Sequence, residues 1–164
     1  MKKVPITTPG APIPTGPFSQ AIRYGNLVFT AGQAGRNRET GVMGDVADQA
    51  RRCFANISAV LEAAGTSLEY ALKVTVLLRH VEDRDAFNAV YKELMPQPYP
   101  ARTAVFCELG NADMLCEIEV VAGKREGSRA RIEVIGCDSS DGSAILPQHD
   151  VAEIESRVAE VGVG

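Results

Sequence analysis

The residue best suited to chemistry is Arg102, which opens an apolar stretch directly after a loop that contains three prolines. A guanidinium is permanently charged and can hold a carboxylate through two parallel hydrogen bonds. An arginine at the mouth of a sheet, beside a proline-restrained loop, could therefore bind a small organic acid. A structural ion pair at a strand end would produce the same pattern and is the commoner arrangement, so both interpretations stay open.

A second candidate is the pair Glu117 and Glu119, which interrupts the apolar run LCEIEVV. Side chains two residues apart on a strand point to the same side. Two carboxylates on one face of an otherwise apolar strand could activate a water molecule or partner a cation. A solvated strand face is the alternative, and it would account for at least one of the two.

Other polar residues give weaker signals. Asn88 could donate a hydrogen bond into a site, although an asparagine near a helix start is more often solvated. The two histidines and four cysteines form no C-x-x-C pair or ligand cluster, so no metal site is expected. The chain contains neither G-x-G-x-x-G nor G-x-x-x-x-G-K-[ST], and no cofactor is expected.

The elements that must position these residues follow from the hydrophobic spacing. Apolar residues recur at helical intervals through 46–64, where Asp45 is a suitable N-cap and Gly65 a suitable stop. A second helix is predicted over 83–94. Residues 1–17 hold five prolines and are predicted to form an extended arm. Strands are predicted at 19–24, 27–31, 71–78, 102–108 and 115–122.

The predicted order is β-β-α-β-α-β-β, which is typical of a two-layer α+β fold with both helices on one face of a mixed sheet. The strand ALKVTVLL is apolar enough to place Val74 or Val76 on the opposite face. Val105 and Cys107 are predicted to belong to the core. Apolar side chains on both faces of a small sheet indicate that another subunit covers the second face.

Composition limits the environment and the partners. No apolar run approaches the roughly 18 residues of a membrane span, and no apolar segment follows the N-terminal lysines. Cys53, Cys107 and Cys116 lie in apolar stretches and are predicted to be buried thiols. A cytoplasmic protein without a membrane partner is therefore expected.

The chain is predicted to consist of a domain over 1–124 and an extension over 125–164. Residues 1–124 carry 13 basic and 13 acidic residues, whereas residues 125–164 carry 4 and 8, which accounts for the net charge of −4. Neither part has a basic stripe, so no nucleic-acid partner is expected. Within the extension, a linker, a short strand over 132–135 and a short helix over 150–161 are predicted.

Several segments, taken together and in order, resemble the reactive intermediate deaminase (RidA) family of imine and enamine deaminases. The resemblance covers about residues 8–123. Each segment is short, but the ordered set is specific. The segments are 16–21 (GPFSQA), 25–33 (GNLVFTAGQ), 61–65 (LEAAG), 73–76 (KVTV), 88–91 (NAVY), 100–102 (PAR) and 117–119 (EIE).

The resemblance implies a chorismate-mutase-like fold, assembled as a homotrimer with clefts between neighbouring subunits. It implies hydrolysis of 2-imino or enamine acids to 2-keto acids and ammonia. By the same resemblance, Arg102 binds the substrate carboxylate and Glu117 positions or activates water. Asn88 lines the site, and the backbone at Gly32 forms part of its wall.

The chain departs from the family pattern at three positions that the resemblance places at the site. Phe18 stands where typical members have tyrosine, Ala31 where many have serine, and Ala104 where many have cysteine. A pocket that loses polar side chains tends to favour a less polar or bulkier substrate. A trimer that binds a small acid without turning it over is the alternative function. RNA cleavage is a third, and the neutral domain and acidic extension argue against it.

Overall fold

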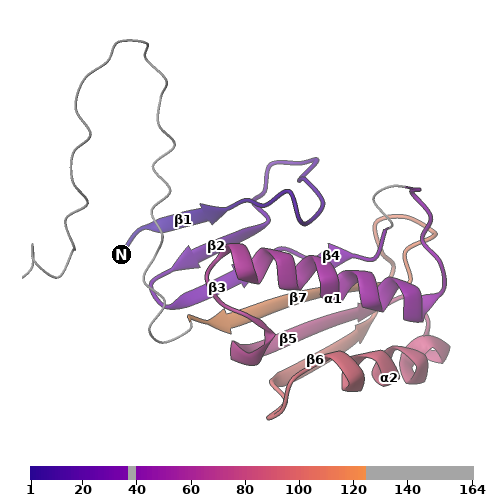
Figure 1. Cartoon of the computed structure of the whole chain (residues 1–164). Coiled ribbons are helices and arrows are strands. Elements are labelled where there is room, and N and C mark those ends of the chain that lie inside the picture. The colour runs from indigo at the N-terminus through magenta and orange to yellow at the C-terminus, as the bar shows by residue number, and fades with distance from the viewer. Residues whose placement is uncertain (37–39, 125–164) are drawn as a thin grey trace, which may run out of the picture. The chain divides into compact units, whose positions relative to one another are not determined.

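A computed structural model of the chain shows how these elements are arranged, and it describes residues 1–36 and 40–124 (Figure 1). The predictions for 125–164, namely the linker, the short strand and the short helix, lie outside the described residues.

The elements follow the predicted order, with two additional strands. The two helices are α1 (Val46–Ala63) and α2 (Arg84–Leu94), and the short 3-10 turns η1 (Leu68–Tyr70) and η2 (Val81–Asp83) precede β5 and α2. The strands are β1 (Lys3–Ile6), β2 (Ala21–Tyr24), β3 (Leu27–Thr30), β4 (Gln33–Ala34), β5 (Ala71–Leu78), β6 (Ala101–Phe106) and β7 (Cys116–Gly123).

The strands form one mixed sheet in the order β1-β2-β3-β7-β5-β6, and β4 pairs with β7 beside β3. Only the β5–β6 pair is parallel, as expected for two strands joined through a helix. A two-residue loop, Gly25-Asn26, joins β2 to β3, and Gly25 has a φ of 61°. The strands predicted over 19–24 and 27–31 thus form a hairpin, whose turn needs a residue that tolerates positive φ.

Helix α1 begins at the predicted residue and ends one residue before the predicted end. The Asp45 side chain accepts a hydrogen bond of 2.9 Å from the Asp48 N–H, which satisfies one of the free donors of the first turn. Gly65, just past the helix, has a φ of 80°, a conformation that glycine adopts without strain. The buried face of α1 includes Cys53, Ile57 and Leu61 and packs on the sheet.

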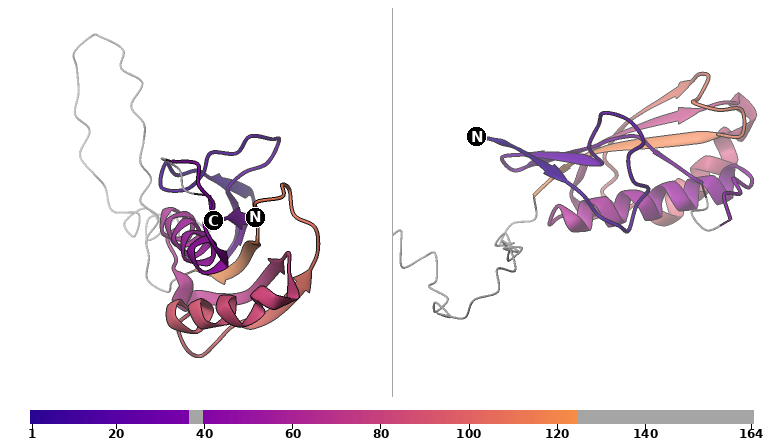
Figure 2. Two further views of the ribbon diagram at one scale, coloured as in Figure 1. Left: turned by 90° about the vertical axis from the view of Figure 1, so that its right-hand side faces the viewer. Right: turned by 90° about the horizontal axis from the view of Figure 1, so that it is seen from above.

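Both helices lie on the same face of the sheet (Figure 2). Val74, Val76 and Leu78 alternate with less buried residues along β5 and belong to the core beneath the helices. The prediction that Val74 or Val76 lies on the opposite face is therefore wrong, because the register of β5 turns both toward α1 and α2. The opposite face carries other side chains, among them Phe29, Leu77 and Val121.

Two strands were missed at the sequence level. The proline-rich arm is extended at its start, where residues 3–6 pair with β2 as edge strand β1 and Pro5 is tolerated. The rest of the arm was predicted to be extended as well, but turns and bends interrupt it at residues 9–11 and 15–17. Strand β4 has only two residues and follows the strand predicted over 27–31. Neither strand is long enough to show an alternating hydrophobic pattern of its own. Strand β1 is defined by its pairing with β2, and strand β4 by its pairing with β7.

Strand β6 forms the other edge of the sheet and is exposed along its whole length. Val105 was predicted to be a core residue, but it is 42% exposed, and so is Phe106. Cys107 is half-buried, whereas Cys53 and Cys116 are buried as predicted. These two core predictions fail because an edge strand has a neighbour on one side only, so its apolar residues stay uncovered within this chain.

Candidate functional site

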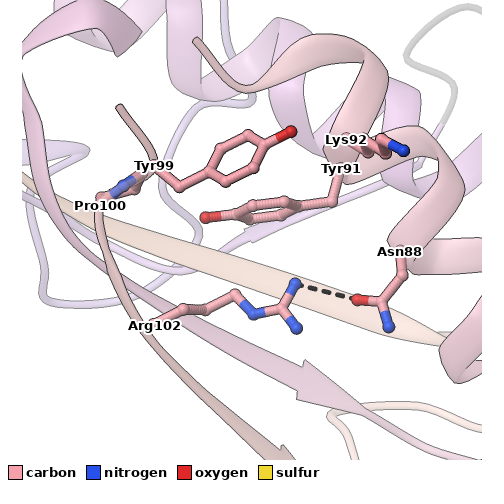
Figure 3. Close-up of a pocket in the computed structure, with 6 residues that line it drawn as sticks. All are labelled: Asn88, Tyr91, Lys92, Tyr99, Pro100 and Arg102. Atoms are coloured by element: carbon pink, nitrogen blue, oxygen red, sulfur yellow. Dashed lines mark hydrogen bonds between the residues drawn. The ribbon is translucent and has the colours of Figure 1, made fainter. Parts of the chain in front are cut away.

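Arg102 lies on β6, directly beneath helix α2 (Figure 3). It pairs in register with Val74, so its side chain points to the helix-covered face of the sheet. Its Nη1 donates a hydrogen bond of 2.9 Å to Oδ1 of Asn88, and its Cζ lies 4.6 Å from the centre of the Tyr91 ring. The side chain is thus held at one edge and on one face, while its other donors have no hydrogen-bond partner among the described residues.

Arg102 has no ion-pair partner in the part of the chain that the structure describes. The ion pairs there involve Arg51, Arg79 and Arg84 instead. The structural ion pair that the sequence left open is therefore not formed by the described residues. An unpaired guanidinium with free donors is a suitable place for an external anion.

A cavity of about 330 Å³ opens beside the Arg102 side chain. Its wall is mostly carbon, contributed by aromatic and proline rings, with one amide and two cationic groups. Figure 3 shows Tyr91 between the Tyr99 ring and the Arg102 guanidinium. The lining residues are Asn88, Tyr91, Lys92, Tyr99, Pro100 and Arg102.

Glu117 lies on the opposite face of the sheet. It pairs with Leu77 on β5 and with Ala34 on β4, and it alternates with Cys116 and Ile118, which are buried beneath the helices. Glu119 shares this face, as predicted, and is exposed. The two carboxylates therefore have different environments, and only that of Glu117 is half-buried.

Gly32 lies against the Glu117 carboxylate. A Cβ atom at Gly32 would be 1.8 Å from Oε1 of Glu117, so no larger residue fits without moving the carboxylate. Burial raises the pKa of Glu117, and the negative charge of Glu119 raises it further. A carboxyl group with a raised pKa accepts a proton more readily near neutral pH than an ordinary glutamate does.

The backbone around Gly32 is a break between two strands that both pair with β7. Residues 31 and 32 separate β3 from β4, and the Thr30 hydroxyl accepts a hydrogen bond of 2.9 Å from the Val120 N–H at this break. The Ala31 N–H donates to the Gln20 carbonyl at 2.8 Å. The break therefore places the Gly32 backbone over Glu117 and connects Ala31 to the preceding loop.

That loop is fastened by the buried Gln20 side chain. Its Nε2 donates to the carbonyls of Thr8, Ala11 and Pro12, and its Oε1 accepts from the Thr8 N–H. Phe18, two residues earlier in this loop, is 55% exposed. The loop is thus ordered by Gln20, while the Phe18 ring remains available for contact with another molecule.

The predicted site residues form two groups within one chain. Arg102, Asn88 and Ala104 lie on the helix-covered side of the sheet, because Ala104 pairs with Val76 as Arg102 pairs with Val74. The second group contains Gly32 and Glu117 on the other side, with Ala31 and the Phe18 loop attached to it. Strand β5 separates β6 from β7, so one chain does not bring Arg102 to Glu117.

Of the six residues that line the Arg102 pocket, only Asn88 and Arg102 were predicted as site residues from the sequence. The other four, Tyr91, Lys92, Tyr99 and Pro100, were missed. The available signal was that aromatic residues bracket Arg102 at 91 and 99, but their contact depends on how α2 packs on β6. Among residues 1–36 and 40–124, no three His, Cys, Asp or Glu side chains form a metal-binding group. Within the same ranges, no helix is long and apolar enough to cross a membrane.

Comparisons with known proteins agree with this architecture. The family profile described as Endoribonuclease L-PSP matches residues 8–124. A RutC family protein of Pyrococcus horikoshii is 48% identical over 126 residues, covering 76% of this chain and 99% of its own. The 2-iminobutanoate/2-iminopropanoate deaminase of Escherichia coli is 36% identical over 124 residues, covering 73% of this chain and 97% of its own.

A solved structure provides an independent comparison. The crystal structure of Escherichia coli TdcF with bound serine superposes with a TM-score of 0.69 at 34% identity, covering 74% of this chain and 99% of that chain. Its α+β fold is the one seen here, with two helices on a mixed sheet. The chain therefore belongs to the Endoribonuclease L-PSP family, the family of the RidA deaminases.

Proposed function

We propose that this protein hydrolyses reactive 2-imino acids, or their enamine tautomers, to 2-keto acids and ammonia. The observation that carries the proposal is the Arg102 guanidinium, which is held by Asn88 and Tyr91 yet lacks a carboxylate partner among the described residues. It is supported by relatives that carry the name 2-iminobutanoate/2-iminopropanoate deaminase.

In the proposed reaction, Arg102 holds the substrate carboxylate through two hydrogen bonds and so orients the C=N bond. Water adds to the imine carbon, and the Glu117 carboxylate accepts one proton from that water. Glu117 then returns the proton to the nitrogen. This gives a carbinolamine. Its hydroxyl proton passes to the nitrogen as the C–N bond breaks, so ammonia leaves and the oxygen remains as the carbonyl of the 2-keto acid. The raised pKa of Glu117 suits both proton transfers.

This chemistry needs a second copy of the chain, since Arg102 and Glu117 lie on opposite faces of the sheet. We propose a homotrimer in which each cleft combines the Arg102 group of one subunit with the Glu117 group of its neighbour. Exposed apolar residues at the β6 edge and on the open face, among them Phe29, Val105 and Phe106, support such contacts.

The same cleft would contain Phe18, Ala31 and Ala104, which replace more polar residues of typical family members. The wall beside Arg102 is mostly aromatic carbon. Both features favour imines with larger or less polar side chains than those of 2-iminopropanoate.

Imines made in place by an L-amino acid oxidase test the activity. Semicarbazide traps the imine, so a deaminase lowers the rate at which the semicarbazone accumulates. Wild type should lower this rate, whereas Arg102→Ala and Glu117→Gln should not. Arg23→Ala, which removes a guanidinium from β2, is the matched control and should behave as wild type.

Two results would redirect the assignment. If wild type lowers no semicarbazone rate but binds 2-ketobutyrate, and Arg102→Ala does not bind it, the protein is a small-acid-binding module. Cleavage of RNA by wild type would support the activity after which the family profile is named. That activity is not favoured here, because residues 1–124 carry as many acidic as basic groups.

A further inference from the structure

Tyr91 lies between two other side chains at the pocket wall (Figure 3). The Tyr99 ring lies on one side, with ring centres 6.3 Å apart, and the Arg102 guanidinium lies on the other, 4.6 Å from the ring centre. A guanidinium over the face of a tyrosine is attracted by the negative face of the ring. One face of the Arg102 guanidinium is therefore covered within the chain.

The Tyr91 ring is a rigid support. Only 6% of its surface is exposed. The Phe54 ring of α1 packs edge to face against the Tyr91 ring, with ring centres 5.7 Å apart. The centre of the Phe87 ring lies 6.3 Å from the centre of the Tyr91 ring. Because core side chains on both helices hold the ring, it cannot move with Arg102.

Arg102, in contrast, is an exposed arginine on an edge strand. A long side chain of this kind loses roughly 2 kcal/mol of rotamer freedom when it is fixed. Asn88 holds one edge of the guanidinium and Tyr91 covers one face. The donors that remain free lie in the guanidinium plane, and an incoming carboxylate meets them edge on.

The hydroxyl group of Tyr91 is not needed for this arrangement. It is buried and has no hydrogen-bond partner among the described residues. A buried hydroxyl without a partner does not stabilise the fold, so the ring carries whatever this tyrosine contributes within the chain.

From this geometry we infer that Tyr91 is a positioning residue, whose ring orients the Arg102 guanidinium for the substrate carboxylate. The inference rests on the proposed function and adds a residue to it. Tyr91 acts through Arg102 and does not take part in bond making or breaking. It therefore affects how tightly a carboxylate is held more than how fast the bound imine reacts.

The test compares Tyr91→Phe, Tyr91→Leu and Leu61→Ala in the full-length protein. Tyr91→Leu should raise the KM for the imine, and the Kd for 2-ketobutyrate, about tenfold with a much smaller change in kcat. Tyr91→Phe keeps the ring and should stay within about twofold of wild type. Leu61→Ala disturbs the same core from the buried face of α1, away from the ring contacts of Tyr91, and should lower the melting temperature but not raise KM.

A double-mutant cycle shows whether the effect passes through Arg102. Lysine presents a point charge and lacks the planar face, so Tyr91→Leu should cost much less in an Arg102→Lys background. An equal cost in both backgrounds would overturn the inference. So would a large loss in Tyr91→Phe, or a rise in KM for Leu61→Ala that equals that for Tyr91→Leu.

Failure of this inference can be told apart from failure of the proposed function. If Arg102→Ala is inactive but Tyr91→Leu keeps wild-type KM, the deaminase assignment stands and Tyr91 has no positioning role. If wild type turns over no imine but Tyr91→Leu weakens 2-ketobutyrate binding about tenfold, the positioning role stands and the deaminase assignment fails. If wild type neither turns over imines nor binds the keto acid, both are overturned.

Discussion

Arg102 and Glu117 lie on opposite faces of one sheet, with β5 between the strands that carry them. The rigidity of a paired sheet prevents either side chain from crossing to the other face. If the two act on one substrate molecule, they must come from different copies of the chain. The relationship leads directly to a complementation experiment.

Mixing two inactive variants should restore activity. When Arg102→Ala and Glu117→Gln chains are co-expressed in equal amounts, about one neighbouring pair in four combines an intact Arg102 with an intact Glu117. Imine turnover should therefore return to about a quarter of the wild-type value. Absence of recovery in trimers shown by native mass spectrometry to be mixed would mean that the two residues do not share a cleft.

Gly32→Ala should inactivate the protein without unfolding it. The new methyl group would overlap Oε1 of Glu117 and force the carboxylate away from its place. A displacement of about 1 Å at a reacting group lowers turnover roughly 10- to 100-fold. Gly110→Ala is the matched control, since a Cβ there would meet only Met114 Sδ at an ordinary 3.6 Å. Equal kcat in Gly32→Ala and wild type would argue against a role for Glu117.

Glu117→Gln should make the protein more stable at neutral pH while removing activity. Burial, and secondly the charge of Glu119, raises the pKa of Glu117 above its unfolded value. The protonated Glu117 side chain therefore favours the folded protein at pH values below the pKa that Glu117 has in the unfolded chain. This contribution to stability is lost as the pH rises through the pKa that Glu117 has in the folded protein. At neutral pH the buried charge opposes folding, and a neutral glutamine removes that cost.

Thermal unfolding measured over a range of pH shows whether Glu117→Gln is more or less stable than wild type. The melting temperature of Glu117→Gln should exceed that of wild type at pH 7, and the difference should shrink as the pH falls toward about 4. Glu119→Gln, at an exposed position on the same face, should show a smaller difference. A melting temperature of Glu117→Gln below wild type throughout would contradict the assigned burial of this carboxylate.

Arg79→Ala should be strongly destabilising. The Arg79 side chain is 10% exposed, donates to the carbonyls of Met114, Leu109 and Asn111, and pairs with Glu108. It thereby closes the loop between β6 and β7. Its removal leaves the carbonyl groups of Met114 and Leu109 without a donor among the described residues, at a cost of about 2–4 kcal/mol in the free energy of unfolding.

Urea denaturation measures that cost. Arg84→Ala provides the control, because Arg84 is exposed and only distantly paired with Asp85, and its loss should change the unfolding free energy by less than about 0.5 kcal/mol. Similar midpoints for both variants would show that the Arg79 hydrogen bonds do not stabilise the loop.

Local patterns were sufficient for the regular elements. Helix α1 begins at its predicted cap and ends one residue before the predicted end, and β5 has its predicted limits, because caps and hydrophobic periodicity act over a few residues. Strands β1 and β4 could not be predicted in this way. Strand β1 exists because it pairs with β2, and strand β4 exists because it pairs with β7. The partner of β4 lies far away in the sequence, so no local pattern reports the pairing.

The candidate site, like the fold, was predictable from the sequence only in part. The sequence alone determined which residues to consider, since Arg102, Glu117, Asn88 and Gly32 stand in motifs that belong to a known family. Only the tertiary structure decided their grouping. The register of β5 with β6 turns Arg102 toward α2, and the register of β7 turns Glu117 the other way. A one-residue shift in either pairing would have reversed the face, and no local pattern encodes that choice.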